Sequence, residues 1–146
     1  QRRPNGEISN PLKNLITKMR DEQQHLGPKT ACYELGITGP DFDLPLYNVA
    51  DENRRMAGPC LSHVSFKLYD GHVHLSALYR SHDYRHKALG NLLGLARLQA
   101  CVANEVSAPI GTLVVFSTYA WVSGSKTPLR QLLKTIRSFE DEKEAS

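Results

Sequence analysis

Residues 61–80, LSHVSFKLYDGHVHLSALYR, decide the fold of this chain. Apolar and polar side chains alternate through 61–69 and again through 72–80, which predicts two strands that each bury one face. Asp70 and Gly71 lie between the two runs, and Asp-Gly is typical of a two-residue hairpin turn. The stretch therefore predicts an antiparallel β-hairpin.

Helical patterns lie on either side of this hairpin in the sequence. Asn10 and Pro11 favour a helix start, and apolar residues at helical spacing predict a helix over 11–25. We expect Gly27-Pro28 to end it. Residues 89–106 are apolar around much of the surface of the predicted helix, so we expect a central, buried helix there.

Two further strands and a third helix complete the expected elements. Residues 30–35 and 110–122 are strand-like, and Thr127-Pro128 opens an amphipathic helix. Residues 36–59 are rich in glycine and proline and predict a long loop, of a size that is often functional or mobile. The order helix, strand, hairpin, helix, strand, helix is typical of an α+β fold.

Length, composition and charge limit the class of protein. The 146 residues fit a single domain over 1–146, with irregular ends at 1–10 and 141–146. Apolar residues make up 40% and charged residues 23%, and no apolar run reaches the ~18 residues of a membrane span. The net charge of +3 fits an anionic ligand such as a nucleotide and is too small to indicate a nucleic-acid-binding surface.

The cysteines and the N-terminus bear on the cellular compartment. Cys32, Cys60 and Cys101 have no paired spacing, so the sequence predicts free thiols in a reducing cytoplasm. We expect Cys32 and Cys101 to be buried core thiols. The sequence begins at Gln1 and has no apolar h-region near its start, so no signal peptide is expected in it.

Three short motifs follow one another along the chain: Pro59-Cys60, Arg80-Ser81-His82-Asp83 and Gly90-Asn91. In this order they resemble the thymidylate synthase family, in which a Pro-Cys dipeptide carries the nucleophilic thiol. There a hairpin leads to an Arg-Ser-x-Asp motif, and an Asn begins a long apolar helix. The resemblance covers 55–125 well and 10–35 loosely. It implies a thymidylate synthase-like mixed β-sheet with a long buried central helix and flanking helices.

The chemistry of these side chains suits a pyrimidine nucleotide. A Cys60 thiolate can add to carbon 6 of the ring, which makes carbon 5 nucleophilic towards a one-carbon unit. Arg80 can lower the pKa of that thiol or bind the 5′-phosphate through its planar fork, and Ser81 can donate to the same phosphate. Asn91 can pair with the O4/N3-H edge of uracil, where relatives acting on cytosine are expected to have Asp.

Each of these residues also has a purely structural interpretation, and the sequence leaves both open. Cys60 can be a buried thiol at a strand start, and Arg80 can be a surface cation. Asp83 can cap the helix or order the loop, and Asn91 can be a helix cap. The histidines at 72, 74, 82 and 86 lack a Cys or carboxylate that would complete a ligand set, so no metal site is expected.

The sequence also departs from the family pattern. Where the resemblance implies a His and a Tyr that contact the sugar hydroxyl, this chain has Tyr119 and Trp121, of which Tyr119 can still hydrogen-bond. His82 stands where many relatives have Cys. The family's N-terminal phosphate loop, its catalytic Glu and Trp and its C-terminal strand and tail have no counterpart. Lys29 is the only cation where relatives have two adjacent arginines.

Two functions and a third possibility therefore stay open. The first is a thymidylate synthase-like enzyme that transfers a one-carbon unit to C5 of a deoxyuridylate-type nucleotide, with 5,10-methylenetetrahydrofolate as donor. The second is a non-catalytic module that binds a pyrimidine nucleotide or a protein partner within a larger complex. The third is a fragment of a longer enzyme. We expect a cytoplasmic homodimer that binds neither a membrane nor nucleic acid.

Overall fold

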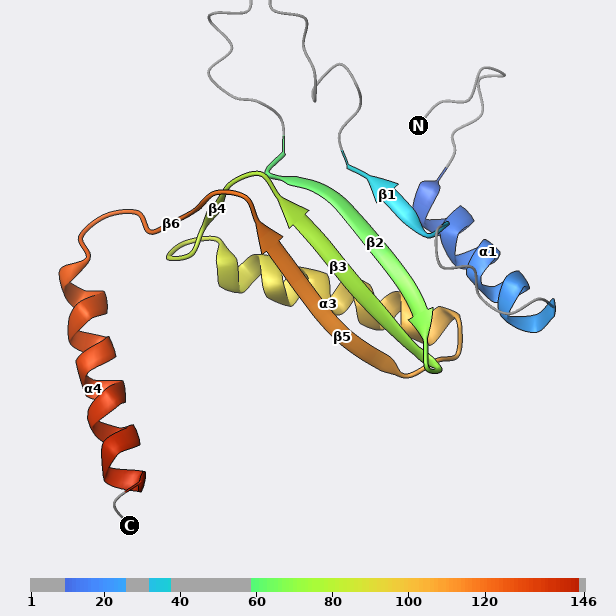
Figure 1. Ribbon diagram of the computed structural model, residues 1–146. Helices are drawn as coiled ribbons and strands as arrows, with labels where there is room; N and C mark the ends of the chain where they lie inside the picture. The colour runs from blue at the N-terminus through green and yellow to red at the C-terminus, as the bar shows by residue number, and fades with distance from the viewer. Residues whose placement is uncertain (1–9, 26–31, 38–58, 145–146) are drawn as a thin grey trace, which may run out of the picture.

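The computed structural model describes residues 10–25, 32–37 and 59–144. Three helices and six strands are assigned within these residues (Figure 1). In chain order they are α1 (Pro11–His25), β1 (Glu34–Gly36), β2 (Leu61–Tyr69), β3 (His72–Tyr79), β4 (His82–Asp83), α3 (Ala88–Glu105), β5 (Ile110–Ser117), β6 (Ala120–Trp121) and α4 (Thr127–Glu144). The elements confirm the α+β class.

The main sheet has the strand order β1-β2-β3-β5 and is mixed. β2 pairs antiparallel with β1 and β3, whereas β3 and β5 run parallel and are joined through α3. The backbone has positive φ at both Asp70 (48°) and Gly71 (70°), as a type I′ hairpin turn requires. This confirms the predicted hairpin.

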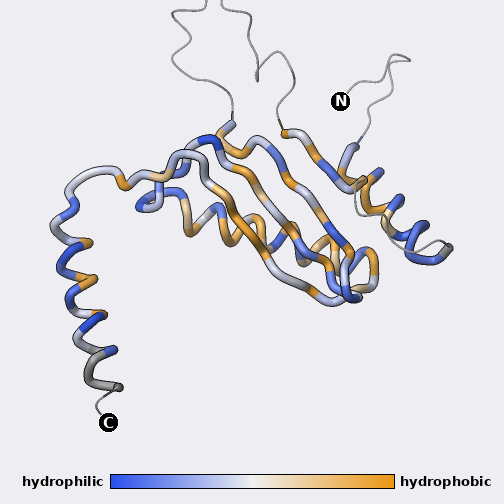
Figure 2. Tube along the Cα trace, in the orientation of Figure 1, coloured by the Kyte–Doolittle hydropathy of each residue, from blue (hydrophilic) through white to orange (hydrophobic). Residues whose placement is uncertain are grey.

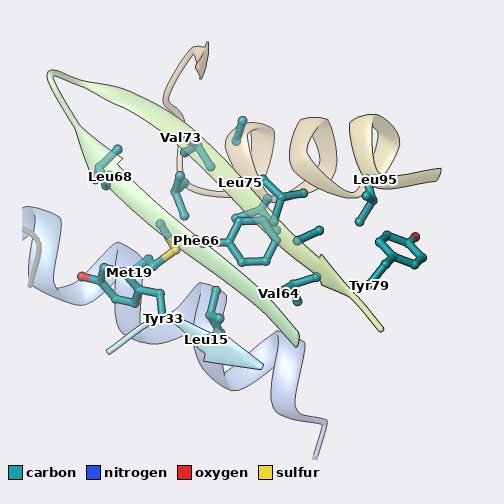
Figure 3. Packing of buried hydrophobic residues seen from close by; sticks show 14 residues of the cluster. Leu15, Met19, Tyr33, Val64, Phe66, Leu68, Val73, Leu75, Tyr79 and Leu95 are labelled. Atoms are coloured by element: carbon teal, nitrogen blue, oxygen red, sulfur yellow. The ribbon is translucent and has the colours of Figure 1, made fainter. Parts of the chain in front are cut away.

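The hydrophobic core lies between one face of this sheet and the helices α1 and α3. Alternate residues of β2 and β3 are buried, among them Phe66 and Leu75, as a strand with one covered face requires (Figure 3). Leu15 and Met19 of α1 reach the same cluster. The start of α1 agrees with the prediction, because the side chain of Asn10 caps the helix: its Oδ1 accepts from the backbone N–H of Lys13 over 3.2 Å.

α3 is the predicted central helix, and it buries only the side that covers the sheet. Leu95 and Val102 are buried on its inner side, whereas Leu89 and Leu93 on its outer side are 73% and 55% exposed. A helix that packs on one layer of strands buries only the side that faces them. The apolar outer side has no cover among the described residues.

The cysteine prediction also needs correction. Cys32 and Cys101 are exposed rather than buried in the core, and Cys60 is exposed too. Cys101 belongs to α3 but does not lie on the side of the helix that packs against the sheet. Cys32 comes two residues before β1.

Three elements differ from the predictions by more than one residue at an end. The first strand is Glu34–Gly36, and residues 30–31 of the predicted 30–35 lie outside the described residues, as do Gly27-Pro28. Residues 38–58, nearly all of the predicted loop, also lie outside them. The expected strand 110–122 is split into β5 and β6. α4 continues to Glu144, further than predicted.

The split of the last strand creates the second, two-stranded sheet. The backbone N–H of Thr118 donates to the carbonyl of Tyr79 over 2.9 Å, and its hydroxyl donates to the carbonyl of Arg80 over 2.9 Å. Beyond Thr118 the chain no longer pairs with β3, and β6 pairs in parallel with β4 instead. These contacts therefore place the segment after β3 beside the segment after β5.

α4 projects away from the sheet (Figure 1). Hydrophobic residues recur along it between hydrophilic ones (Figure 2), and Leu132, Leu133 and Ile136 are exposed. No helix among the described residues is long and apolar enough to cross a membrane.

Candidate functional site

A pocket of about 550 Å³ opens at the end of β3, where β4, β6 and the start of α3 meet. Ten residues from five segments line it: Pro59, Cys60, Leu61, Tyr79, Ser81, His82, Asp83, Lys87, Asn91 and Trp121. Four of the predicted site residues are therefore brought together: Cys60, Ser81, Asp83 and Asn91.

Cys60 is held at the mouth of this pocket by its backbone. It directly precedes β2, and its carbonyl accepts a 2.9 Å hydrogen bond from the backbone N–H of Arg80 at the end of β3. The thiol is exposed. Burial raises the pKa of the Tyr79 hydroxyl, and the nearby Cys60 raises that pKa further. The pocket thus holds an accessible thiol beside a tyrosine that stays protonated.

Arg80 and Tyr119 are not among the residues that line this pocket. The Arg80 guanidinium donates through Nε to the Ser62 hydroxyl over 3.3 Å. Tyr119 is 63% exposed and lines a neighbouring hollow of about 680 Å³. Its backbone does support the pocket, because its carbonyl accepts from the backbone N–H of His82 over 2.8 Å.

Asp83 ties together the two segments that flank the pocket. Its Oδ2 accepts from the Ser123 hydroxyl over 2.7 Å, and its Oδ1 accepts from the backbone N–H of Arg85 over 3.0 Å. Desolvation acts to raise the pKa of this carboxyl, but the hydrogen bonds from Ser123, Arg85 and His86 together lower it. The carboxylate therefore stays charged and orders this loop.

Asn91 lies in the first turn of α3 and does not cap the helix. Its backbone N–H donates to the carbonyl of Lys87 over 2.9 Å. Ser81 also lines the pocket, and its hydroxyl accepts from Trp121 Nε1 over 3.3 Å. Asn91 and Ser81 thus supply an amide and a hydroxyl to the pocket.

His82 is the site residue that sequence reasoning did not select. It is 2% exposed, and its ring stacks on Tyr79 with a centroid distance of 4.4 Å and an interplanar angle of 8°. Its Nδ1 lies 3.1 Å from the Ser117 hydroxyl, and its Nε2 lies 3.1 Å from Nδ2 of Asn91. The signal that could have found it is its place inside the Arg-Ser-x-Asp motif.

No group of three metal-ligating side chains occurs within residues 10–25, 32–37 and 59–144. His74, one of the histidines considered above, instead accepts through Nδ1 from the backbone N–H of Thr112 over 3.0 Å. Its ring packs so close to Gly111 that a Cβ at that glycine would lie 2.7 Å from it. His74 therefore has a structural role beside β5.

Comparison with curated proteins finds relatives over part of the chain. A protein of Methanosarcina barkeri named "Putative thymidylate synthase" is 39% identical over 64 residues, which are 44% of this chain and 30% of that protein. Proteins with the same name from Methanosarcina acetivorans and Methanothermobacter thermautotrophicus are 41% and 39% identical over 64 residues, or 44% of this chain and 30% and 29% of theirs. No family model matches.

A solved structure extends the similarity to the fold. Thermostable thymidylate synthase A from Bacillus subtilis superposes with a TM-score of 0.66 and 19% identity, covering 90% of this chain and 42% of that one. The chain therefore has a thymidylate synthase-like fold. It spans 30% of the length of the first curated relative it matches.

Proposed function

We propose that this thymidylate synthase-like chain transfers a one-carbon unit to C5 of a deoxyuridylate-type nucleotide, with Cys60 as the nucleophile. The observation that carries the proposal is that Cys60, Ser81 and Asn91 line one pocket of about 550 Å³. Such a volume falls within the range of small-molecule sites. The family resemblance of the chain supports the same chemistry.

In the proposed first step, the Cys60 thiolate forms a bond to C6 of the pyrimidine. The C5=C6 electron pair moves onto C5 and the O4 carbonyl, so negative charge develops at O4. An N–H of Asn91 donated to O4 would stabilise that charge. The nucleophilic C5 would then bond to the one-carbon unit of the donor. Loss of the C5 proton and cleavage of the bond between that carbon and the donor nitrogen would leave an exocyclic methylene, to which water, or hydride from the donor, would add as the Cys60 thiolate leaves and the ring is restored.

The other predicted residues have proposed binding roles. Ser81 and Arg80 would bind the 5′-phosphate, Arg80 by turning its guanidinium from Ser62 towards the nucleotide. Tyr119 would hydrogen-bond to the sugar. Asp83 would hold the loop around the nucleotide in place through Ser123, which it already contacts.

The neighbouring hollow of about 680 Å³ suits the proposed donor, 5,10-methylenetetrahydrofolate. Trp121 lines both this hollow and the pocket, so the two adjoin. Leu129 and Leu133 offer apolar surface to a flat ring system, and Lys126 and Arg130 offer charge to its carboxylates. When bound there, the folate would supply the one-carbon unit.

We also propose that the chain acts in the cytoplasm as a homodimer. The sheet face opposite α3 would form the interface. Along β5 this face presents Val114 and Phe116, which are 51% and 62% exposed, and exposed apolar residues on an uncovered sheet face favour pairing with a second copy.

A second candidate function is nucleotide or partner binding without turnover, as a module of a larger complex. The observation that favours it is that Arg80 and Tyr119 do not line the pocket.

Debromination of 5-bromo-2′-deoxyuridylate separates the two candidates without folate. Cys60 first adds to C6, and a proton adds to C5. A thiolate of dithiothreitol then removes the bromine from C5. The second thiol of dithiothreitol displaces bromide from this sulfur and forms the cyclic disulfide. Elimination of Cys60 then gives deoxyuridylate. Mass spectrometry follows the loss of bromine from the nucleotide. We expect the wild-type protein to debrominate it and the Cys60→Ser protein not to do so.

Cys101→Ser is the matched control, because Cys101 is also an exposed thiol but lies outside the pocket. It should debrominate at the wild-type rate. Equal rates for wild type and Cys60→Ser would contradict the proposed nucleophile. Nucleotide binding in that case would favour the non-catalytic module.

A further inference from the structure

Lys87 brings a positive charge to the proposed nucleotide pocket. It lines the pocket at the start of α3, and its side chain is exposed. Its ammonium has no hydrogen-bond or ion-pair partner among the described residues. Asp83, the other charged residue of the lining, accepts instead from the Ser123 hydroxyl and from the backbone N–H of Arg85. The pocket therefore contains a cation that is available to a ligand.

The local structure does not explain a lysine at this position. Lys87 is the N-cap residue of α3, where Ser, Thr, Asn or Asp would accept from a free backbone N–H, and its side chain makes no capping bond. A cation is also unfavourable there, because the amino end of a helix carries partial positive charge. No acidic residue occurs in the first turn of α3 to offset it. A residue that breaks local rules in this way is typical of a functional site.

Lys87 and Asn91 lie one helical turn apart on the same side of α3. The backbone N–H of Asn91 donates to the carbonyl of Lys87 over 2.9 Å, and both residues line the pocket. Residues at this spacing are neighbours on the surface of a helix. The ammonium and the amide can therefore approach the same part of a bound nucleotide, which in the proposed function is O4 of the pyrimidine.

The other ionisable side chains of the lining, apart from the proposed nucleophile, are already engaged. Tyr79 and His82 are buried, and their rings stack on each other. Both ring nitrogens of His82 are also within hydrogen-bond distance of other side chains. The Asp83 carboxylate carries no proton and is bonded as described above. Lys87 is thus the ionisable group of the lining that combines N–H donors with open access to the pocket.

We infer that Lys87 is a catalytic residue, whose ammonium donates to O4 of the pyrimidine and stabilises the negative charge that Cys60 addition places there. The inference rests on the proposed function, since it assumes that Cys60 adds to C6 of a bound nucleotide. Hydrogen bonds that involve ionised groups are about twice as strong as those between neutral groups. The ammonium therefore binds the adduct more tightly than the nucleotide before addition, as catalysis requires. The lysine keeps its proton, and no covalent bond to it forms or breaks.

Debromination of 5-bromo-2′-deoxyuridylate tests this role without folate. Lys87→Met keeps a long, unbranched side chain and removes its charge. We expect kcat to fall by about a hundredfold to a thousandfold, as for other groups that stabilise a developing oxyanion. The Kd for 2′-deoxyuridylate, measured by calorimetry, should change by less than about threefold, because O4 carries no full charge before the thiolate adds. Lys87→Arg keeps the positive charge and should recover much of the lost rate.

Lys134→Met is the matched control, because it makes the same change at an exposed lysine of α4 outside the pocket lining. It should debrominate the nucleotide at the wild-type rate. Lys87→Met itself should unfold at the wild-type temperature or slightly above it, since a cation is removed from the amino end of α3. Thermal unfolding followed by circular dichroism thus separates a loss of kcat from a loss of structure.

Two results would overturn the inference and leave the proposed function standing. One is debromination that depends on Cys60 and proceeds at the wild-type rate in Lys87→Met. The other is a Lys87→Met protein that binds 2′-deoxyuridylate more weakly but the nucleoside 2′-deoxyuridine unchanged, because the lysine would then contact the phosphate. Wild-type protein that does not debrominate the nucleotide overturns the proposed function and the inference together.

Discussion

Gln99 is the buried polar side chain that fastens α3 to the sheet. It is 2% exposed, and its Nε2 donates to the carbonyls of Val73 (2.8 Å), Gly111 (3.2 Å) and Thr112 (3.3 Å). These carbonyls belong to β3 and β5, so one amide joins the helix to both of the parallel strands.

Loss of this amide should weaken the fold. Gln99→Leu keeps the apolar packing but leaves buried carbonyls without a donor, so we expect the free energy of unfolding to fall by about 1–3 kcal/mol. Urea denaturation followed by circular dichroism measures it. Gln131→Leu, at an exposed position of α4, should change the free energy by less than about 0.5 kcal/mol. Equal effects of the two changes would contradict the bridging role.

The hairpin depends on a turn with left-handed backbone. Asp70 and Gly71 have φ of 48° and 70°, and the turn sets the register that pairs Tyr69 with His72. Because side chains alternate along a strand, a shift by one residue would turn the buried face of β2 to solvent.

Two glycine-to-alanine changes should therefore have opposite effects. Gly71→Ala places a Cβ in left-handed backbone and should lower the free energy of unfolding by about 1 kcal/mol. Gly90→Ala lies within α3 with no atom within 4 Å of the added Cβ, and should raise it by about 0.5–1 kcal/mol. Thermal unfolding measures both. A stabilising Gly71→Ala would contradict the turn geometry.

Elements with a strong local signal could be predicted from the sequence. The Asp-Gly turn and the alternating strands fixed the hairpin, and Asn10 with Pro11 fixed the start of α1. The apolar surface of α3 could not reveal that only one side is covered, because that depends on which neighbour packs there. The contacts of His82 could not be predicted for a similar reason, because its partners Ser117 and Asn91 are separate in sequence and meet only in the fold.

At the scale of the whole molecule, the two faces of the main sheet differ. The face away from α3 carries a polar cluster at its β1 end. Glu34 accepts hydrogen bonds from His63 (2.7 Å), from Ser65 (2.9 Å) and from Lys67. Partial burial acts to raise the pKa of Glu34, but the bonds from Lys67, His63 and Ser65 outweigh it, and the pKa lies below its usual 4.5. The folded protein therefore favours the charged carboxylate.

This shift gives the stability a dependence on acid. The contribution of Glu34 is present above its unfolded-state pKa of about 4.5 and is lost as the pH falls through its lower folded-state pKa. At neutral pH, Glu34→Gln should lower the free energy of unfolding by less than about 1 kcal/mol, since the cluster is partly exposed. Urea titrations at several pH values should show that difference disappearing in acid. Glu140→Gln, at an exposed position of α4, should follow the wild-type curve throughout.

β5 ends the main sheet on the side opposite β1, and none of its eight residues, IGTLVVFS, is charged. No strand among the described residues pairs with its outer side, so the N–H and C=O groups there are open to an approaching extended chain, and no charge on β5 repels that chain. β1, by contrast, is three residues long and carries Glu34. Aggregation of this protein in concentrated solution should therefore begin at β5, and a lysine placed at Thr112 or Val114 is the change that would hinder it.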